Sequence, residues 1–180
     1  FAKEGAAVII ADRRADLGEA LAADITASQG RASFIAMDVA QEADWKRLIE
    51  KALSDYGRID ILVNNAGISG SAVGDMLSLE GWNQLMSINA TGVFLGTTLV
   101  GQVMAQQGKG SIVNISSIMA NRATDGLLAY SMSSAAIDQM TRAMAVSLAL
   151  IVLVAMTGSC VISGLFGAIV PITLRRLGAD

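Results

Sequence analysis

Short apolar runs alternate with amphipathic segments along most of this chain of 180 residues. The run Ala-Ala-Val-Ile-Ile-Ala at residues 6–11 suits a strand that is buried on both faces, and residues 42–56 repeat their apolar side chains at helical spacing. Strands are expected in this way at residues 6–11, 32–37, 60–64 and 110–115, and helices at residues 16–29, 42–56, 81–107 and 130–147. Because parallel strands need helical crossovers, this order predicts an α/β fold with a doubly wound parallel sheet.

Polar residues follow several of these expected strands. Asp12, Asp38, Asn64–Asn65 and Ser116–Ser117 each stand where a strand ends. The carboxyl ends of parallel strands meet at one edge of the sheet, and ligands of such sheets bind there. We therefore expect a binding site at this edge, independently of any likeness to a known family.

The two aspartates allow two interpretations each. The Asp12 carboxylate can accept hydrogen bonds from the ribose hydroxyls of an adenosine and would repel a 2′-phosphate, or it can cap the helix that follows. The adjacent Arg13 and Arg14 leave a phosphate tolerable, but NAD is favoured over NADP. Asp38 can accept from an adenine amino group while Val39 packs on the ring, or it can cap the next helix.

Two amide-containing segments come next along the chain. In Asn65-Ala66-Gly67 the small side chains would let a flat ligand approach the backbone closely, although such turns also serve purely structural purposes. Asn89 lies inside a helical segment, where Asn is mildly unfavourable and often marks a kink or a bound water. The alternative for Asn89 is an exposed amide, and an interruption of the helix is expected near residues 90–92.

Ser117 and Tyr130 can face the same cleft, one from a strand end and one from the start of a helix. A hydroxyl pair of this kind can hold a carbonyl oxygen while the phenol donates a proton. A phenol that exchanges protons at neutral pH needs a nearby cation, because its ordinary pKa is about 10. One helical turn after Tyr130 the chain has Ser134, which carries no charge.

Together and in this order, these residues resemble the short-chain dehydrogenase/reductase family over residues 1 to about 145. The resemblance implies a Rossmann-like fold, a nicotinamide cofactor and alcohol–carbonyl interconversion. It implies that Ser117 polarises the substrate oxygen, that Tyr130 is the acid/base and that Asn89 holds a relay water. It further assigns the adenosine side of the cofactor to a set of six residues: Asp12, Asp38, Val39, Asn65, Ala66 and Gly67.

The chain departs from this family's pattern in two places that bear on activity. Ser134 stands where the pattern Tyr-x-x-x-Lys has lysine, so we expect turnover to be severely reduced or absent. The strand and glycine-rich phosphate loop that open the family's fold are not found, since residues 1–5 are expected to be the last turn of a helix with Gly5 as its cap. We therefore expect an incomplete Rossmann-like sheet that binds the cofactor weakly.

The end of the chain differs in composition from the rest. No charged residue occurs between Arg142 and Arg175, which is long enough for a bilayer-spanning helix. Residues 146–180 resemble a transmembrane helix of MgtE-type magnesium transporters. A division is thus expected into a partial dinucleotide-binding domain at 1–145 and a long apolar, membrane-type helical segment at 146–180. The alternative is a soluble helix that continues the one starting at Tyr130.

Composition excludes several classes of function. With no His and one Cys the chain is expected to hold no metal site and no disulfide, and its scattered basic residues and net charge of -3 do not indicate nucleic acid binding. The residues before the apolar end are expected to be cytoplasmic, and residues 146–177 allow membrane association. By family, a small alcohol or carbonyl substrate and a homo-oligomer are implied.

Three functional hypotheses stay open at this point. The first is an NAD-linked oxidoreductase acting on CH–OH groups, impaired by Ser134 and by the absent phosphate loop. The second is a membrane segment derived from a magnesium transporter. The third is a chimeric or mis-assembled chain with neither activity.

Overall fold

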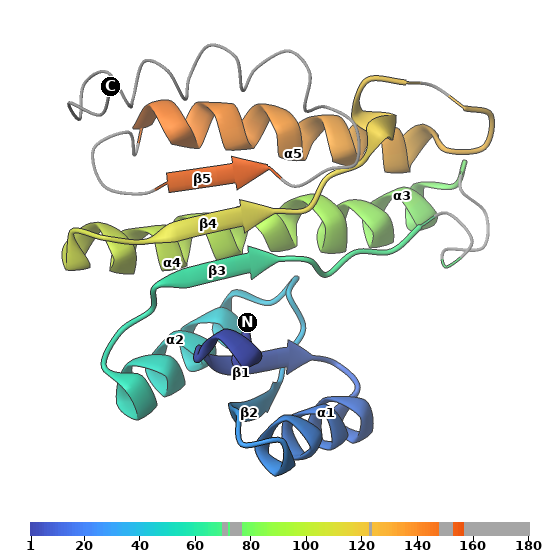
Figure 1. Ribbon diagram of the computed structural model, residues 1–180. Coiled ribbons are helices and arrows are strands. Elements are labelled where there is room, and N and C mark those ends of the chain that lie inside the picture. Colours follow the sequence, from blue (N-terminus) through green and yellow to red (C-terminus); the bar gives the residue numbers. More distant parts are fainter. Residues whose placement is uncertain (70–71, 73–76, 123, 148–152, 157–180) are drawn as a thin grey trace.

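The computed structural model describes residues 1–69, 72, 77–122, 124–147 and 153–156 of the chain (Figure 1). Its strands are β1 (Ala7–Asp12), β2 (Arg31–Ala36), β3 (Ile61–Asn64), β4 (Ser111–Asn114) and β5 (Leu153–Met156). Its α-helices are α1 (Ala15–Ala27), α2 (Glu42–Tyr56), α3 (Leu79–Met86), α4 (Val93–Gln107) and α5 (Leu128–Ser147). Short 3-10 helices occur at η1 (Ala2–Glu4) and η4 (Ile118–Ala120), and a π-helix at η3 (Ser87–Gly92). The expected alternation of strands and helices is confirmed.

All strand pairs are parallel, but the described strands form two separate sheets. β1 pairs with β2, and β3, β4 and β5 pair in that order. Figure 1 shows the two-stranded sheet below the three-stranded one, with β1 and β3 as the facing edges. Among the residues that the structure describes, no strand joins the two sheets. The Rossmann-like α/β architecture is therefore present with an open seam between β1 and β3.

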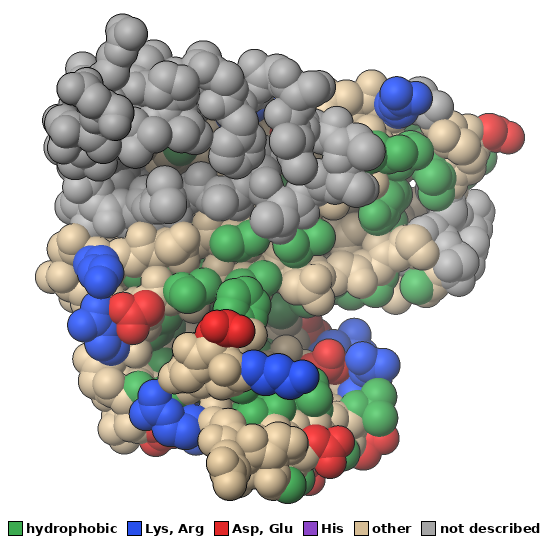
Figure 2. Space-filling model, in the orientation of Figure 1, with side chains coloured by type: hydrophobic (Ala, Val, Ile, Leu, Met, Phe, Trp, Pro, Cys, Tyr) green, Lys and Arg blue, Asp and Glu red, His purple; other side chains and the backbone are tan. Residues whose placement is uncertain are grey.

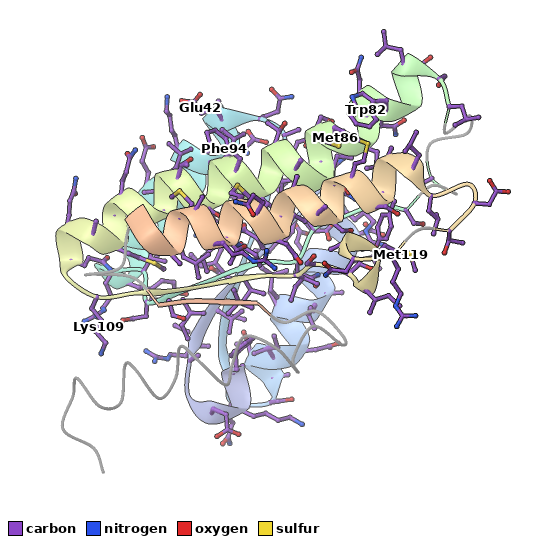
Figure 3. The ribbon with its side chains drawn as sticks, turned by 90° about the horizontal axis from the view of Figure 1, so that it is seen from above. Glu42, Trp82, Met86, Phe94, Lys109 and Met119 are labelled. Carbon is purple, nitrogen blue, oxygen red and sulfur yellow. The ribbon has the colours of Figure 1, made fainter. Side chains whose placement is uncertain are left out.

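Helices α3 and α4 with η3, and helix α5, cover one face of the three-stranded sheet, as seen from above in Figure 3. The main apolar core lies where α2 and α4 pack together across the seam. Its buried members are Met37, Trp45, Leu48, Val100, Met104 and Ile112. Because this core draws side chains from both sheets, packing holds the two together in place of a shared hydrogen-bond ladder.

The expected break in the long helix between α3 and α4 is confirmed, and it has the form of a π-helix. A π-helical turn widens the backbone ring and is common at functional sites. Asn89 lies inside this turn and is 4% exposed, so the alternative of an exposed amide is wrong. The buried Asn89 side chain points toward the loop after β3, where it forms hydrogen bonds with Ile68.

One expectation about buried faces is wrong in detail. Residues 6–11 were expected to form a strand buried on both faces, yet the residues of β1 are only half-buried and Ala11 is exposed. In β3, Ile61 and Val63 are 50% and 37% exposed. In α1, Leu17 and Leu21 are 52% and 50% exposed, because α1 packs its Gly18 against the ring of Phe34.

The expectation of one long apolar helix at the end of the chain is wrong over Leu153–Met156. These residues form β5, which pairs in parallel with β4. A run such as Leu-Val-Ala-Met suits a buried strand as well as a membrane helix, and periodicity alone does not separate the two. The remaining residues of the expected segment, 148–152 and 157–180, lie outside those described.

One described segment is long and apolar enough to cross a membrane by composition alone. It is Leu79–Gln107, with a hydropathy of 1.3. This segment is α3, η3 and α4, which pack against the sheet, and core helices of water-soluble proteins pass the same test. The segment is thus weak evidence for a membrane span.

Candidate functional site

The carboxyl ends of the strands meet at one edge of the fold, as expected. Strands β3 and β4 run in register from Ile61 opposite Ser111 to Asn64 opposite Asn114, so the residues that follow them start side by side. Asn65, Ala66 and Gly67 leave the end of β3 as an exposed segment. Ser116 and Ser117 leave the end of β4 and lead into η4.

The Asn89 side chain forms two hydrogen bonds with the segment that follows Gly67. The backbone N–H of Ile68 donates to Asn89 Oδ1 at 2.8 Å, and Asn89 Nδ2 donates to the carbonyl of Ile68 at 2.8 Å. The same Nδ2 reaches Ser133 Oγ of α5 at 3.4 Å. This side chain therefore joins the loop after β3, the π-helix and α5. Its amide is occupied by protein groups, so a relay water would need another polar group of Asn89, such as its backbone.

Carbonyl groups at the start of α5 accept three hydrogen bonds, two from serines of α5 itself and one from Ser116. Ser133 Oγ and Ser134 Oγ each donate to the carbonyl of Tyr130 at 2.9 Å, and Ser116 Oγ donates to the carbonyl of Ser134 at 3.2 Å. Ser133 and Ser134 are 0% and 3% exposed. The turn that carries Tyr130 is thus held to the end of β4 by Ser116 and to the π-helix by Ser133.

Ser117 and Tyr130 are both half-buried at this turn. Ser117 Oγ accepts from the backbone N–H of Met119 at 3.2 Å and caps η4. The Tyr130 phenol makes no hydrogen bond with the residues that the structure describes. Lys109 lies at the other end of β4, away from Met119 and the start of α5 (Figure 3). No described lysine therefore takes the place that Ser134 leaves uncharged.

Asp12 closes β1 next to a guanidinium group. Its Oδ1 accepts from the Arg14 backbone N–H at 2.9 Å and from Arg14 Nε at 3.3 Å. The backbone N–H of Arg14, and then its side chain, hold the pKa of Asp12 below its ordinary value. The helix-cap alternative is wrong, because Arg14 is the N-cap of α1. Oδ2 makes no hydrogen bond to a described residue and stays free for a ligand hydroxyl.

Asp38 and Val39 lie in the loop after β2, beside the amino end of α2. Asp38 Oδ1 accepts from the Ala40 backbone N–H at 2.9 Å, which is a local turn and not a helix cap, since Gln41 caps α2. The Val39 carbonyl accepts from Trp45 Nε1 at 2.8 Å, and Gly92 of η3 lies directly against Val39, where a Cβ would come within 2.8 Å of Val39 Cγ2. The position of Val39 is thus set by two other elements.

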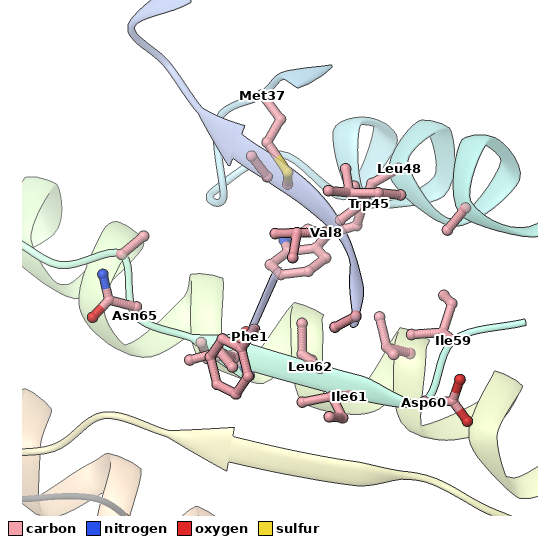
Figure 4. A pocket seen from close by; sticks show the side chains of 18 of the residues that line it. Phe1, Val8, Met37, Trp45, Leu48, Ile59, Asp60, Ile61, Leu62 and Asn65 are labelled. Carbon is pink, nitrogen blue, oxygen red and sulfur yellow. The ribbon is translucent and has the colours of Figure 1, made fainter. Parts of the chain in front are cut away.

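A cavity of about 650 Å³ runs along the seam and opens toward these residues (Figure 4). In Figure 2 hydrophobic side chains are exposed in the hollow between the upper and lower parts of the molecule. Four of the six expected cofactor residues line the cavity, namely Asp12, Val39, Asn65 and Ala66, together with Gly92. Asp38, Gly67, Ser117 and Tyr130 are outside its lining.

Sequence reasoning missed a buried polar network behind the site. Asn64 Nδ2 donates to Asn114 Oδ1 at 2.8 Å, and Asn114 Nδ2 donates to Thr141 Oγ1 at 2.9 Å. Thr97 joins them from α4, accepting from Asn64 Nδ2 at 3.2 Å. All four side chains are buried. The signal was an Asn that ends each of two apolar strands, which is costly unless the amides pair.

Comparison with known proteins agrees with this geometry. The family model for short chain dehydrogenases matches residues 1–164. The chain belongs to the short-chain dehydrogenase family. The match passes residue 145, where the family resemblance was expected to end, and it includes β5. The likeness to MgtE-type transporters has no support in these comparisons.

The chain is 37% identical over 145 residues to the 2,5-dichloro-2,5-cyclohexadiene-1,4-diol dehydrogenase of Sphingobium indicum, covering 81% of this chain and 58% of that protein. It is 39% identical over 149 residues to the cyclopentanol dehydrogenase of Comamonas testosteroni, covering 83% and 60%. A gluconate 5-dehydrogenase of Burkholderia cenocepacia, crystallised with NADP and tartrate, aligns with a TM-score of 0.78 at 31% identity, covering 87% of this chain and 63% of that one. The chain thus spans about three fifths of each relative's length.

Proposed function

We propose that this chain is built for nicotinamide-dependent interconversion of small alcohols and carbonyl compounds, with a proton-transfer centre that its own residues leave impaired. The observation that carries the proposal is the set of hydrogen bonds around the first turn of α5. Hydrogen bonds of Asn89, Ser133 and Ser116 join this turn to η3 and to the end of β4, which supports a shared site for Tyr130 and Ser117. The relatives named as cyclic alcohol and diol dehydrogenases support this class of substrate.

A free hydrogen-bond acceptor at the end of β1 supports the proposed cofactor site. Asp12 keeps one carboxylate oxygen unengaged by described residues, which suits a ribose hydroxyl. A carboxylate there disfavours a 2′-phosphate, so we propose NAD over NADP, although a structural relative was crystallised with NADP. Val39 and the exposed Asn65-Ala66 backbone would line the adenosine. When bound, the nicotinamide supplies the hydride chemistry.

On the substrate side, the proposed roles are those that the family resemblance implies. Ser117 Oγ would donate to the substrate oxygen, and the Tyr130 phenol would give or take its proton. Ser134 provides no charge for that step, because its hydroxyl donates to the Tyr130 carbonyl inside the same helix. A nearby cation favours the ionised form of a phenol in general, and Ser134 does not supply one. We therefore propose that turnover is severely reduced.

Ser134→Lys tests this proposal, with Ser134→Ala as the matched control. NAD- and NADP-linked oxidation of cyclopentanol and a cyclic diol would be measured for the wild-type chain and both variants. We expect the lysine variant to gain about 100-fold or more, the usual contribution of general acid–base catalysis, and Tyr130→Phe to remove that gain. NADH fluorescence titration would separate binding from turnover. Wild-type turnover near a usual 10 s⁻¹ would refute the proposal.

The remaining proposals concern the parts around the site. We propose that residues 1–145 act as the dinucleotide-binding part in the cytoplasm, that a strand and phosphate loop complete it, and that residues 146–177 can contact a membrane.

We also propose a homo-oligomer formed through α4 and α5. Exposed Phe94 on α4 and Met132 on α5, at 51% and 48%, support such an apolar contact. Sedimentation of Phe94→Glu against the wild-type chain tests the oligomer.

A further inference from the structure

The loop after β2 is held by two charged side chains from the start of α2. Asp44 Oδ2 accepts from the Asp38 backbone N–H at 2.7 Å. Arg47 donates to the Ala36 carbonyl at 2.7 Å, and its guanidinium pairs with Asp44 Oδ1 at 3.2 Å. The Asp44 side chain is 20% exposed, so its charge-assisted bond to Asp38 is partly shielded from water. One carboxylate thus connects the loop to α2, and one guanidinium holds that carboxylate in place.

The other side of the same loop is held by packing. The Val39 carbonyl accepts from Trp45 Nε1 at 2.8 Å, and Trp45 is 4% exposed. Gly92 of η3 lies so close to Val39 that a larger residue at position 92 would collide with it. The backbone of Asp38 and Val39 is therefore constrained by both α2 and η3 before any ligand binds.

This constraint leaves one acceptor and one donor unused on consecutive residues. Asp38 Oδ1 accepts from the Ala40 backbone N–H at 2.9 Å, whereas Asp38 Oδ2 has no hydrogen-bond partner among the described residues. The backbone N–H of Val39 likewise has no partner in the part of the chain that the structure describes. The loop thus offers a carboxylate oxygen and the next backbone N–H to a ligand.

An acceptor next to a donor matches one edge of adenine. On its Watson–Crick edge the 6-amino group donates and the neighbouring ring nitrogen accepts. Hypoxanthine has a 6-oxo group and a protonated ring nitrogen, so it presents the reverse order to the same loop. Polar groups left facing like partners cost more affinity than a contact that is simply absent.

The bond from Asp44 differs from an ordinary helix cap. In a capping box the third residue of a helix accepts from the backbone N–H of the N-cap. The N-cap of α2 is Gln41, but Asp44 accepts from Asp38, three residues before that cap. The bond therefore constrains the loop beyond the end of the helix, at the residue whose carboxylate oxygen is free.

We propose that Asp44, held by Arg47, is a positioning residue that makes this loop select 6-aminopurines over 6-oxopurines. Asp44 itself touches no ligand. It fixes the backbone of Asp38, so that the free carboxylate oxygen and the Val39 N–H keep one relative placement. The ligand is the adenine end of the nicotinamide cofactor, so this proposal rests on the proposed function.

The test measures the binding of adenosine and inosine to the full chain. Neither nucleoside carries a phosphate, so their binding does not depend on the phosphate loop. Chemical-shift titration of the isotope-labelled chain would give both dissociation constants, with the Val39 amide as the reporter. We expect the wild-type chain to prefer adenosine about tenfold, as one unmatched hydrogen-bonding group implies.

Variants of Asp44 separate positioning from stability. Asp44→Ala removes the acceptor, and we expect the preference for adenosine to fall to about twofold or less, because the loop gains conformational freedom. Asp44→Asn keeps an oxygen that can accept from the Asp38 N–H, so it should retain a preference of about fivefold or more. A loss of stability alone would weaken the binding of both nucleosides equally and leave their ratio unchanged.

Asp55→Ala is the matched control on the same helix. It also removes an aspartate and breaks an ion pair, with Lys51 at 2.7 Å, but it lies at the other end of α2. We expect it to leave the preference for adenosine unchanged.

Arg47→Ala is a second variant, and it tests the proposal even if Asp44→Ala does not fold. The Arg47 side chain is 56% exposed, so its removal leaves the core intact. Asp44 then loses its ion pair and the Ala36 carbonyl loses its donor. We expect the preference for adenosine to fall about threefold.

Three outcomes would overturn the proposal. They are no detectable binding of adenosine to the wild-type chain at millimolar concentration, equal binding of adenosine and inosine, and an unchanged preference in Asp44→Ala and Arg47→Ala. Turnover of Ser134→Lys with NAD tests the proposed function separately. A clear preference for adenosine that Asp44→Ala abolishes, with no turnover in Ser134→Lys, would support the positioning role and contradict the proposed function.

Discussion

The two sheets of this protein differ in the interactions that stabilise each of them. Behind β3, β4, α4 and α5, four buried side chains form a continuous polar network: Asn64, Thr97, Asn114 and Thr141. Around β1 and β2 the described residues show no such network. There Leu17 and Leu21 of α1 are half-exposed, and one edge of β1 is open. The half that carries Tyr130 is therefore specified by internal hydrogen bonds, and the half that carries Asp12 depends on apolar packing.

This difference matters because hydrogen bonds and apolar packing specify different things. Paired amides accept only one register, since a shift leaves buried donors and acceptors without partners. Apolar packing is non-directional and tolerates small displacements. The half that contains β3, β4 and α5 can thus hold the first turn of α5 in one place, while the half that contains β1 and β2 is positioned mainly by apolar contacts such as Gly18 against the ring of Phe34.

The largest expected effect comes from breaking the polar network at its centre. Asn114→Leu would leave the side chains of Asn64 and Thr141 buried with a lost partner each, and an unsatisfied buried group costs about 1–3 kcal/mol. We expect the free energy of unfolding to fall by about 3 kcal/mol, measured by urea denaturation. Asn121→Leu, at an exposed position, is the matched control. A loss below about 1 kcal/mol would mean that the network does not distinguish the halves.

The next effect concerns the contact between the halves. A Cβ at Gly96 of α4 would collide with Asn64 Oδ1 on one side and with the ring of Trp45 on the other. We expect Gly96→Ala to destabilise the fold by about 1–3 kcal/mol through overpacking. Thermal unfolding followed by circular dichroism would measure this, with Gln102→Ala on the exposed side of α4 as control. Unchanged stability would show that α4 and α2 separate without cost.

A smaller effect, on amide exchange, should be confined to the half of the molecule that contains β1 and β2. Trp45→Phe keeps an aromatic ring but removes the N–H that donates to the Val39 carbonyl, which is worth about 1 kcal/mol. We expect faster amide exchange in β1 and β2 with no change in β4. Trp82→Phe, at the other tryptophan, should leave both unchanged. Equal acceleration in β4 would show that this hydrogen bond stabilises both halves of the molecule.

The smallest expected effect is a change in the pKa of Asp12, at the carboxyl end of β1. Arg14→Ala removes the side-chain donor to Asp12, so the pKa of Asp12 should rise toward its ordinary value, as read by NMR titration of its carboxyl carbon. The depressed pKa contributes stability above the unfolded-state pKa, and this is lost as pH falls through the folded-state value. The pair is largely exposed, so the change in stability should stay below about 1 kcal/mol.

Arg13→Ala serves as the control for that change. The backbone N–H groups of residues 13 and 14 remain in both variants, so only the loss of the Arg14 side chain should raise the pKa of Asp12. A rise of the same size in Arg13→Ala would show that general positive charge, and not the hydrogen bond from the Arg14 side chain, lowers the pKa of Asp12.

Local sequence patterns were sufficient to place most helices and strands, but they did not show which faces of these elements are buried. Turn residues and apolar spacing placed β1 to β4 within a residue or two, and the unfavourable Asn89 marked the interruption that proved to be a π-helix. They did not give the buried face of α1, because Gly18 packs closely on Phe34 and leaves Leu17 and Leu21 exposed. The apolar stretch after Ser147 suited a helix and a strand equally, and pairing with β4 made Leu153–Met156 a strand.

The sequence by itself determined the order of strands and helices, the polar residues at the strand ends and the absence of a charge at Ser134. These follow from periodicity and residue chemistry, which are local. Only the tertiary structure decided that Asn64, Asn114 and Thr141 share one network and that β1 and β3 face each other across a groove. Those arrangements depend on which distant groups must satisfy one another once water is excluded, and no local pattern contains that information.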